Sequence, residues 1–322
     1  MSQAVGMGLF ARTKKIAGWM AISFHEDGIT VACVKRLPAA APEVGLVAFY
    51  PASKSELSGP LEKLSKELHA DRYSCSALLA SGEYQILSVD APNVPPAELK
   101  TAIRWRLKDL LDYHIEDAMI DVLDIPPEKN APARNHSMHA VAARNQLIEQ
   151  RVALFGQARI PLSVIDIPEM AQRNISALLE PEGRGVALLS FDSEGGLLTV
   201  TFSGELYLSR RIDVRLSQLM QSHADERNAC YDRVTLELQR SLDHIDRQYH
   251  FIALSKLVLS PLGESSFGLQ EYLAANLYMQ VEALNLETVL DITRVPELKS
   301  LEAQQRYFMT LGAALRHEGK VL

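Results

Sequence analysis

The chain has few cysteines and no long hydrophobic run. Its three cysteines, Cys33, Cys75 and Cys230, lie far apart without paired spacing, so the sequence predicts neither a disulfide framework nor a zinc site, and buried, reduced thiols are expected. No apolar stretch reaches the roughly 18 residues that a membrane helix needs, and no charged-then-apolar signal segment opens the chain. Without either feature, we expect a cytoplasmic protein.

Positive charge is also scarce. The net charge of −7 argues against nucleic acid as a partner, because a phosphate backbone is bound by a clustered basic face. Hydrophobic residues make up 47% and charged residues 23% of the 322 residues, which is the balance of a folded globular protein. That length fits about two domains or lobes, each with its own core.

The N-terminal tail, residues 1–15, differs from the rest of the chain. From Met7 it reads MGLFARTKK, an apolar pair followed by a basic cluster, which would suit an anionic membrane surface. A solvated terminus explains the same residues without any ligand, and we prefer that simpler interpretation.

Strand-like and helix-like segments alternate along the rest of the chain. Alternating β-branched residues around an acidic glycine turn at 25–28 predict a β-hairpin. Leucines at helical spacing predict a helix at about 56–69, and a long helix is predicted at about 225–250. Two strands, 115–125 and 137–144, are predicted on either side of a polar loop.

The two halves of the chain begin alike. AISFHED-GITVACV from Ala21 and LLSFDSEGGLLTVTF from Leu188 share the order strand, Ser-Phe, acidic turn with glycine, strand. Ser23-Phe24 therefore matches Ser190-Phe191. Internal repeats are strong indicators of architecture, so we expect two related lobes, each opened by the same hairpin.

The order of further segments resembles the PilM family of type IV pilus assembly proteins, which belongs to the actin-like ATPase superfamily. The likeness runs from about residue 19 to the end. The segments that carry it are AIRWRLKDLLDYHIEDAMIDVLDI from Ala102, HAVAARNQLIEQRVALFGQARIPLSVIDIPEMAQRN from His139, and LELQRSLDHIDRQYHFIALSKLVLS from Leu236. The start MGLF and the altered turns described below are most similar to the member that serves the mannose-sensitive haemagglutinin (MSHA) pilus.

The resemblance implies a fold of the α/β class, an actin-like (ribonuclease H-like) duplicated two-lobe fold with an inserted α+β subdomain in the first lobe. It assigns residues 16–182 to the first lobe, with the inserted subdomain at about 82–142. Residues 183–322 form the second lobe.

Family members with working nucleotide sites have an Asp-x-Gly turn in each half, whose carboxylate holds metal-bound water and whose glycine admits phosphates. Here Ser23 and Ser190 stand at the aspartate positions, and His25 and Asp192 stand at the first glycine positions. A hydroxyl lacks the negative charge that positions hydrated Mg²⁺. The carboxylates of Asp192 and Glu194 would repel a triphosphate.

The third nucleotide element departs from the family as well. Where the family has a glycine-rich turn against the adenosine, residues 259–268 read LSPLGESSFG, and Pro261 removes a donor and fixes φ. We therefore expect weak or absent nucleotide binding, no catalytic residues and no metal site. If ATP and Mg²⁺ bind at all, the resemblance assigns them to Ser23, His25, Gly28, Asp192, Ser193, Gly195, Gly196, Glu237, Arg240, Gly263 and Ser265.

A partner-binding role follows from the same resemblance. It implies a cytoplasmic scaffold, peripheral at the inner membrane of a Gram-negative bacterium, that binds the N-terminal tail of a PilN-like (or MshJ-like) inner-membrane protein. The tail would lie in a groove between the first lobe and the inserted subdomain, where an extended peptide is held by main-chain hydrogen bonds and side-chain pockets. Contact with the pilus motor complex is a further expectation.

Two alternatives stay open from the sequence. The first is an ATP-binding PilM-type protein whose nucleotide state gates partner binding, and the second is a protein that assembles into filaments as actin relatives do. Three smaller expectations concern single residues: that Arg210 or Arg211 pairs with an acidic neighbour, that Trp105 belongs to the core, and that His136, His139, His244 and His250 are solvated or capping histidines rather than metal ligands.

Overall fold

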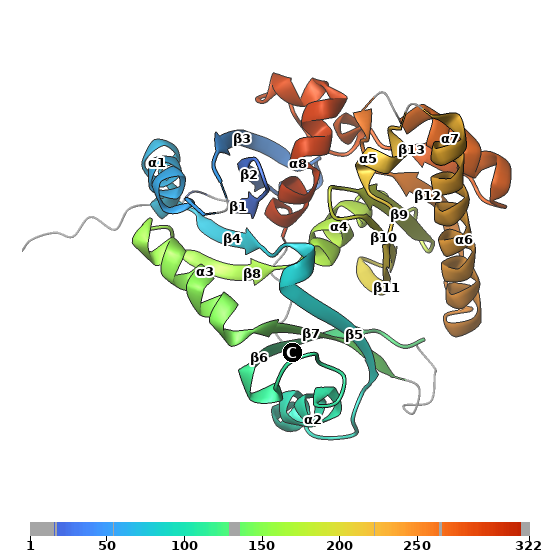
Figure 1. The fold of residues 1–322 in the computed structure, drawn as a ribbon, viewed down its shortest axis with the longest axis horizontal. Helices are drawn as coiled ribbons and strands as arrows, with labels where there is room; N and C mark the ends of the chain where they lie inside the picture. The colour runs from blue at the N-terminus through green and yellow to red at the C-terminus, as the bar shows by residue number, and fades with distance from the viewer. Residues whose placement is uncertain are drawn as a thin grey trace, which may run out of the picture.

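The residues that the structure describes form three β-sheets, with helices between and around them (Figure 1). Two sheets have five strands and the third has three. The computed structural model describes residues 16, 18–53, 55–128, 136–221, 223–263 and 266–316, so the predicted tail at 1–15 lies outside the described residues.

The N-terminal part of the chain builds the first five-stranded sheet. Its order is β3-β2-β1-β4-β8, in which β1, β2 and β3 are antiparallel neighbours while β4 and β8 run parallel to β1. Leu61 and Leu64 of α1 (Ser58–Leu68), with Phe155 of α3 (Asn145–Gln157), cover one face. The strands are β1 (Trp19–Phe24), β2 (Gly28–Lys35), β3 (Glu43–Pro51), β4 (Ser74–Leu78) and β8 (Leu162–Asp166).

The second sheet repeats this plan in the order β11-β10-β9-β12-β13. Ser23 and Ser190 each hold the penultimate position of the first strand of their sheet, so the predicted duplication is confirmed. The strands are β9 (Gly185–Phe191), β10 (Gly196–Phe202), β11 (Glu205–Ile212), β12 (Leu254–Leu259) and β13 (Val281–Ala283). The helices α5 (Leu216–Leu219), α6 (Ala224–Gln248) and α7 (Ser266–Asn276) lie on the outer face, with Val234 and Leu238 of α6 in its core.

Two helices fill the space between the five-stranded sheets (Figure 1). The helix α4 (Pro168–Ser176) follows the first sheet in the chain, yet it packs against β9, β10 and β11. The last helix, α8 (Leu301–Ala314), packs against β1, β2 and β4. Each half therefore takes the helix that covers its inner face from the other half. The lobe boundaries at 16–182 and 183–322 stay a prediction.

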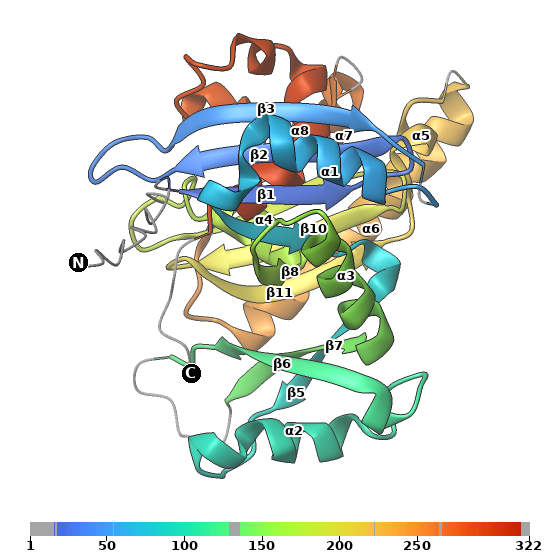
Figure 2. The ribbon, with the colours of Figure 1, turned by 90° about the vertical axis from the view of Figure 1, so that its left-hand side faces the viewer.

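The three-stranded sheet, in the order β5-β7-β6, lies at one end of the molecule (Figure 2). It consists of β5 (Tyr84–Asp90), β6 (Ala118–Ile125) and β7 (Ser137–Arg144), and α2 (Leu99–Leu107) covers one face. The core prediction for Trp105 is wrong, because α2 buries Ile103 and Leu107 while the Trp105 side chain on its other side is 71% exposed.

The prediction of buried cysteines is confirmed, since the side chains of Cys33, Cys75 and Cys230 are all buried. The prediction that His139 is solvated is wrong. Its ring lies buried between β7 and the second lobe, and this burial lowers the pKa of His139 to about 4. His136 lies at the surface, with its Nε2 2.5 Å from Asp124 Oδ1.

The described ranges contain no group of three or more His, Cys, Asp or Glu residues that could hold a metal ion, and none of their helices is long and apolar enough to cross a bilayer.

Candidate functional site

The two hairpin turns that open the halves have the same geometry. The His25 N–H donates to Gly28 O at 2.8 Å, and the Asp192 N–H donates to Gly195 O at 2.9 Å. His25 and Asp192 are therefore structural equivalents. The strand that leads into each turn carries a buried serine, Ser23 or Ser190, each only 3% exposed.

Ser23 is buried against α8 by a chain of hydroxyl groups. Thr310 Oγ1, on α8, donates to Ser23 Oγ at 3.0 Å and lies 2.7 Å from Thr30 Oγ1. His25 Nε2 lies 2.8 Å from Thr30 Oγ1, and burial lowers the pKa of His25. Thr310 gives its own proton to Ser23, so Thr30 donates to Thr310 and His25 donates to Thr30. The His25 imidazole therefore carries its proton on Nε2. The hydroxyls are thus paired with protein groups at the position where a working site would have its aspartate.

Ser190 is held in an equivalent way by α4. Its Oγ donates to Gln172 Oε1 at 2.6 Å. Gln172 is fully buried, and its Nε2 donates to Leu188 O at 2.8 Å and to Thr199 Oγ1 at 2.9 Å. A buried amide with several partners is costly to disturb, so Ser190 is fixed within the interface between the halves.

The second turn uses its own backbone amides internally. Asp192 Oδ1 accepts from Glu194 N–H at 2.8 Å and from Gly195 N–H at 3.0 Å. These are the groups that a phosphate-binding turn would offer to an anion. Asp192 is therefore more than the repulsive charge predicted from the sequence, because its carboxylate pairs with these two amides.

An arginine of α8 forms an ion pair with the first turn, residues 25–28. Arg306 Nη1 lies 2.9 Å from Asp27 Oδ2, and the guanidinium group lies 4.4 Å from the centroid of the Phe49 ring. A Cβ atom at Gly28 would stand 2.4 Å from Tyr50 O. Close strand packing therefore accounts for this glycine without a phosphate.

The predicted adenosine contacts belong to an ion-pair cluster. Glu237 Oε1 lies 2.9 Å from Arg240 Nη1, and Glu237 Oε2 lies 3.4 Å from Arg210 Nη1 on β11. Arg211 pairs with Glu169. The prediction that Arg210 or Arg211 pairs with an acidic residue is therefore confirmed, and it holds for both arginines. Gly263 has φ +65°, and a Cβ atom there would lie 3.7 Å from Gln305 Oε1 on α8.

The structure places most of the predicted site residues in three separate groups: the first turn, the second turn and the helix α6. Ser23, His25 and Gly28 share one turn, Asp192, Ser193, Gly195 and Gly196 share the other, and Glu237 and Arg240 lie on α6. Ser265 lies outside the described residues. Other protein groups pair the two serines, the Glu194 and Gly195 amides of the second turn and the Glu237 carboxylate.

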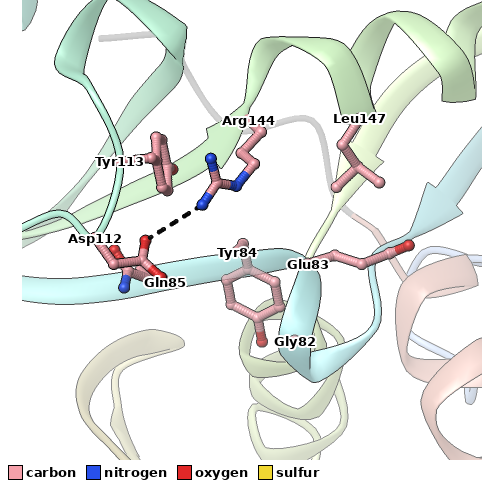
Figure 3. Close-up of a pocket in the computed structure, with 8 residues that line it drawn as sticks. All are labelled: Gly82, Glu83, Tyr84, Gln85, Asp112, Tyr113, Arg144 and Leu147. Carbon is pink, nitrogen blue, oxygen red and sulfur yellow. Dashed lines mark ion pairs between the residues drawn. The ribbon is translucent and has the colours of Figure 1, made fainter.

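A second candidate site lies where the inserted subdomain meets α3 (Figure 3). It is a cavity of about 280 Å³ lined by Gly82, Glu83, Tyr84, Gln85, Asp112, Tyr113, Arg144 and Leu147. The sequence analysis predicted a groove in this region but none of these residues. They come from three separate segments that only the folded chain brings together.

Two of the residues that line the cavity carry covered polar atoms without partners. Tyr113 Oη and Gln85 Oε1 are buried and have no hydrogen-bond partner among the described residues. The Arg144 guanidinium lies 4.2 Å from the centroid of the Tyr113 ring and pairs only loosely with Asp112, at 3.9 Å. A ligand with both hydrogen-bond donors and acceptors, such as a peptide main chain, would pair with Tyr113 Oη and Gln85 Oε1 only if the side chains that cover them moved aside.

Comparison with known proteins decides the fold. No family model and no curated protein matches the chain. A chain from the PilM–PilN type IV pilus biogenesis complex superposes with a TM-score of 0.68, over 93% of this chain and 98% of that one, at 18% sequence identity. The protein has an actin-like fold. The predicted fold class is confirmed, and at this identity the likeness carries the fold alone.

Two further solved structures are more distant. One is a Bacteroides thetaiotaomicron protein with an actin-like ATPase fold and unknown function, with a TM-score of 0.49 and 11% identity over 91% of this chain and 99% of that one. The other is the cytoplasmic domain of EpsL, an inner-membrane component of the type II secretion system of Vibrio cholerae. Its TM-score is 0.43, at 15% identity over 64% of this chain and 76% of that one.

Proposed function

We propose that the chain is a cytoplasmic actin-like scaffold of a type IV pilus assembly machine. In this proposal it binds the N-terminal tail of a PilN-like inner-membrane protein in the cavity beside the inserted subdomain, and that partner holds it at the membrane. The observation that carries the proposal is the coincidence of two facts. The fold resembles a chain of a PilM–PilN complex along almost its whole length, and the cavity has unpaired polar groups where the sequence resemblance expects a groove.

The chemistry of the cavity supports an extended peptide as the ligand. Tyr113 Oη can donate to a peptide carbonyl, and Gln85 Oε1 can accept from a peptide N–H. A buried polar group without a partner costs about 1–3 kcal/mol, so a ligand that pairs both groups recovers this cost on binding. The Tyr113 ring and the Leu147 side chain add apolar surface.

The test is the affinity for a synthetic peptide with the N-terminal tail of the PilN-like protein from the same organism, measured by calorimetry. Tyr113→Phe and Gln85→Leu each remove one hydrogen bond of about 1 kcal/mol, so each should weaken binding about fivefold. Tyr50→Phe is the matched control, because it removes a hydroxyl that donates to Glu67, on α1. If the unaltered protein does not bind, the proposal is wrong. If both variants bind as tightly as the unaltered protein, the cavity is not the site.

A finer proposal assigns the chain to the MSHA pilus, in the role of the protein MshI, with an MshJ-like protein as its partner. Its support is the N-terminal MGLF and the serine at both aspartate positions. The MshJ-like tail peptide should then bind at least tenfold more tightly than a PilN-like tail from another pilus system.

We further propose that the nucleotide turns are degenerate and that partner binding needs no ATP. Mg-ATP and Mg-ADP at millimolar concentration should give neither saturable heat nor a rise in melting temperature. A ligand at 100 times its Kd would add about 2.7 kcal/mol to the stability, so binding would be easily seen. Asp192→Gly, which frees two turn amides, tests whether that carboxylate is the block. Saturable binding to the unaltered protein would instead favour a nucleotide-gated scaffold.

A further inference from the structure

Glu83 and Tyr84 are neighbours in the wall of the cavity, and each takes part in a buried ion-pair cluster elsewhere. Figure 3 shows the Tyr84 ring turned away from Arg144 and Tyr113. The wall of the proposed partner site is therefore tied to two other parts of the molecule.

Tyr84 reaches the second lobe. Its hydroxyl donates to Glu169 Oε2 on α4 and accepts from Arg211 Nη2 on β11 at 2.7 Å. Glu169 is fully buried, and its Oε1 lies 3.2 Å from Arg211 Nη2. In the strand register Arg211 faces Leu197, the residue that follows Gly196. This cluster thus joins the cavity wall to the strands that flank the 192–196 turn.

Glu83 reaches the first lobe. Arg151 Nη2, on α3, lies 2.8 Å from Glu83 Oε1 and 3.0 Å from Oε2, and the Arg151 side chain is almost completely buried. The guanidinium of Arg151 lies 4.2 Å from the centroid of the Phe24 ring. Phe24 directly precedes His25, so this cluster ends at the 25–28 turn.

Each ion pair has one buried member, Glu169 or Arg151, and one partly exposed member, Arg211 or Glu83. The buried member resists displacement, because a charge that loses its partner away from water is strongly destabilised. If the cavity wall moves, the side chains paired with Glu83 and Tyr84 therefore move with it, unless those ion pairs or hydrogen bonds break. Two consecutive residues connect one wall to the two equivalent turns of the duplicated fold, one turn in each half.

We infer that occupation of the cavity is coupled to both hairpin turns, through Tyr84–Glu169–Arg211 to the 192–196 turn and through Glu83–Arg151–Phe24 to the 25–28 turn. The coupling rests on the proposed function, since the occupant is the PilN-like tail. A coupling free energy works in both directions, so whatever moves the turns also changes the affinity of the cavity for the tail.

The test is hydrogen–deuterium exchange of the full chain with and without the tail peptide. In the unaltered protein, the peptide should slow exchange at the cavity segments 82–85 and 112–116 and change the exchange rate at both turns at least twofold. Tyr84→Phe should abolish the response at 192–196 and keep the response at 25–28. Arg151→Lys, which keeps the charge but loses the flat contact with Phe24, should do the opposite. Tyr50→Phe is the control and should keep both responses.

The outcomes separate this inference from the proposed function. If the peptide leaves exchange at the cavity segments unchanged, the proposed function is wrong. If it slows exchange there while both turns stay unchanged, or if both variants keep both responses, the coupling is wrong and the proposed function stands. Because Arg151→Lys removes a buried guanidinium, the folding of that variant is checked first by circular dichroism. If it does not fold, Glu83→Gln replaces it as the variant for the 25–28 response.

Discussion

Replacing Gly312 with alanine should lower the free energy of unfolding by about 3 kcal/mol, as expected where an added atom overpacks a rigid contact. A Cβ atom at this position would stand 2.3 Å from Ala171 O and 2.7 Å from Ala171 C. Both are backbone atoms, so no side chain can rotate away. The helices α4 and α8 would have to separate, and both five-stranded sheets pack on these helices.

Urea unfolding followed by circular dichroism measures this loss. The matched control is Gly156→Ala in α3, where an added Cβ meets nothing within 4 Å. That change should raise stability by about 0.5–1 kcal/mol, because alanine loses less backbone entropy than glycine in a helix. If Gly312→Ala is as stable as the unaltered protein, the two helices can move apart freely, and the exchanged packing does not hold the halves together.

The duplication could be predicted from the sequence, whereas the exchange of helices could not. The echo of Ser23-Phe24 in Ser190-Phe191 identifies equivalent strands because it lies in the strand and turn themselves. Helical spacing shows that a helix has an apolar face. It does not show which of two equivalent sheets that face covers, since both offer the same kind of apolar surface.

Polar residues at core positions were the main obstacle to predicting the site. Gln172 and Thr310 are fully buried and hold the two serines, yet each belongs to the opposite half from the serine it contacts. Sequence patterns treat such residues as solvent-facing. Their role follows only from the exchange of α4 and α8, which brings residues about 18 and 287 positions apart into contact.

The two errors at single residues have a common cause. The core prediction for Trp105 came from the resemblance to a family helix in which this tryptophan is more often a core residue. His139 was expected to be solvated or capping because the histidines lack the spacing of metal ligands. In the structure α2 buries only one side, while His139, on β7 of the inserted subdomain, faces Leu206 on β11 of the second half. Burial there depends on neighbouring layers and not on residue type.

The second large effect is expected at Glu169. Glu169→Ala should cost about 2 kcal/mol at neutral pH, less than for a fully buried pair, because the Arg211 side chain that loses its partner is 33% exposed. Arg211 would lose the carboxylate at 3.2 Å, and the Tyr84 hydroxyl would lose its acceptor. Glu169→Gln, which keeps the shape and one acceptor oxygen, should lose less.

An exposed ion pair supplies the comparison for Glu169. Asp27 and Arg306 lie 2.9 Å apart, but their side chains are 58% and 45% exposed. Asp27→Ala should therefore cost less than about 1 kcal/mol, as exposed pairs do. Both losses are read from the same urea titrations, repeated at high salt, which screens the exposed pair and leaves the buried one almost unchanged. Equal losses for Glu169→Ala and Asp27→Ala would mean that water reaches the Tyr84–Glu169–Arg211 cluster, and a hydrated cluster would not transmit displacement from the cavity wall to the second lobe.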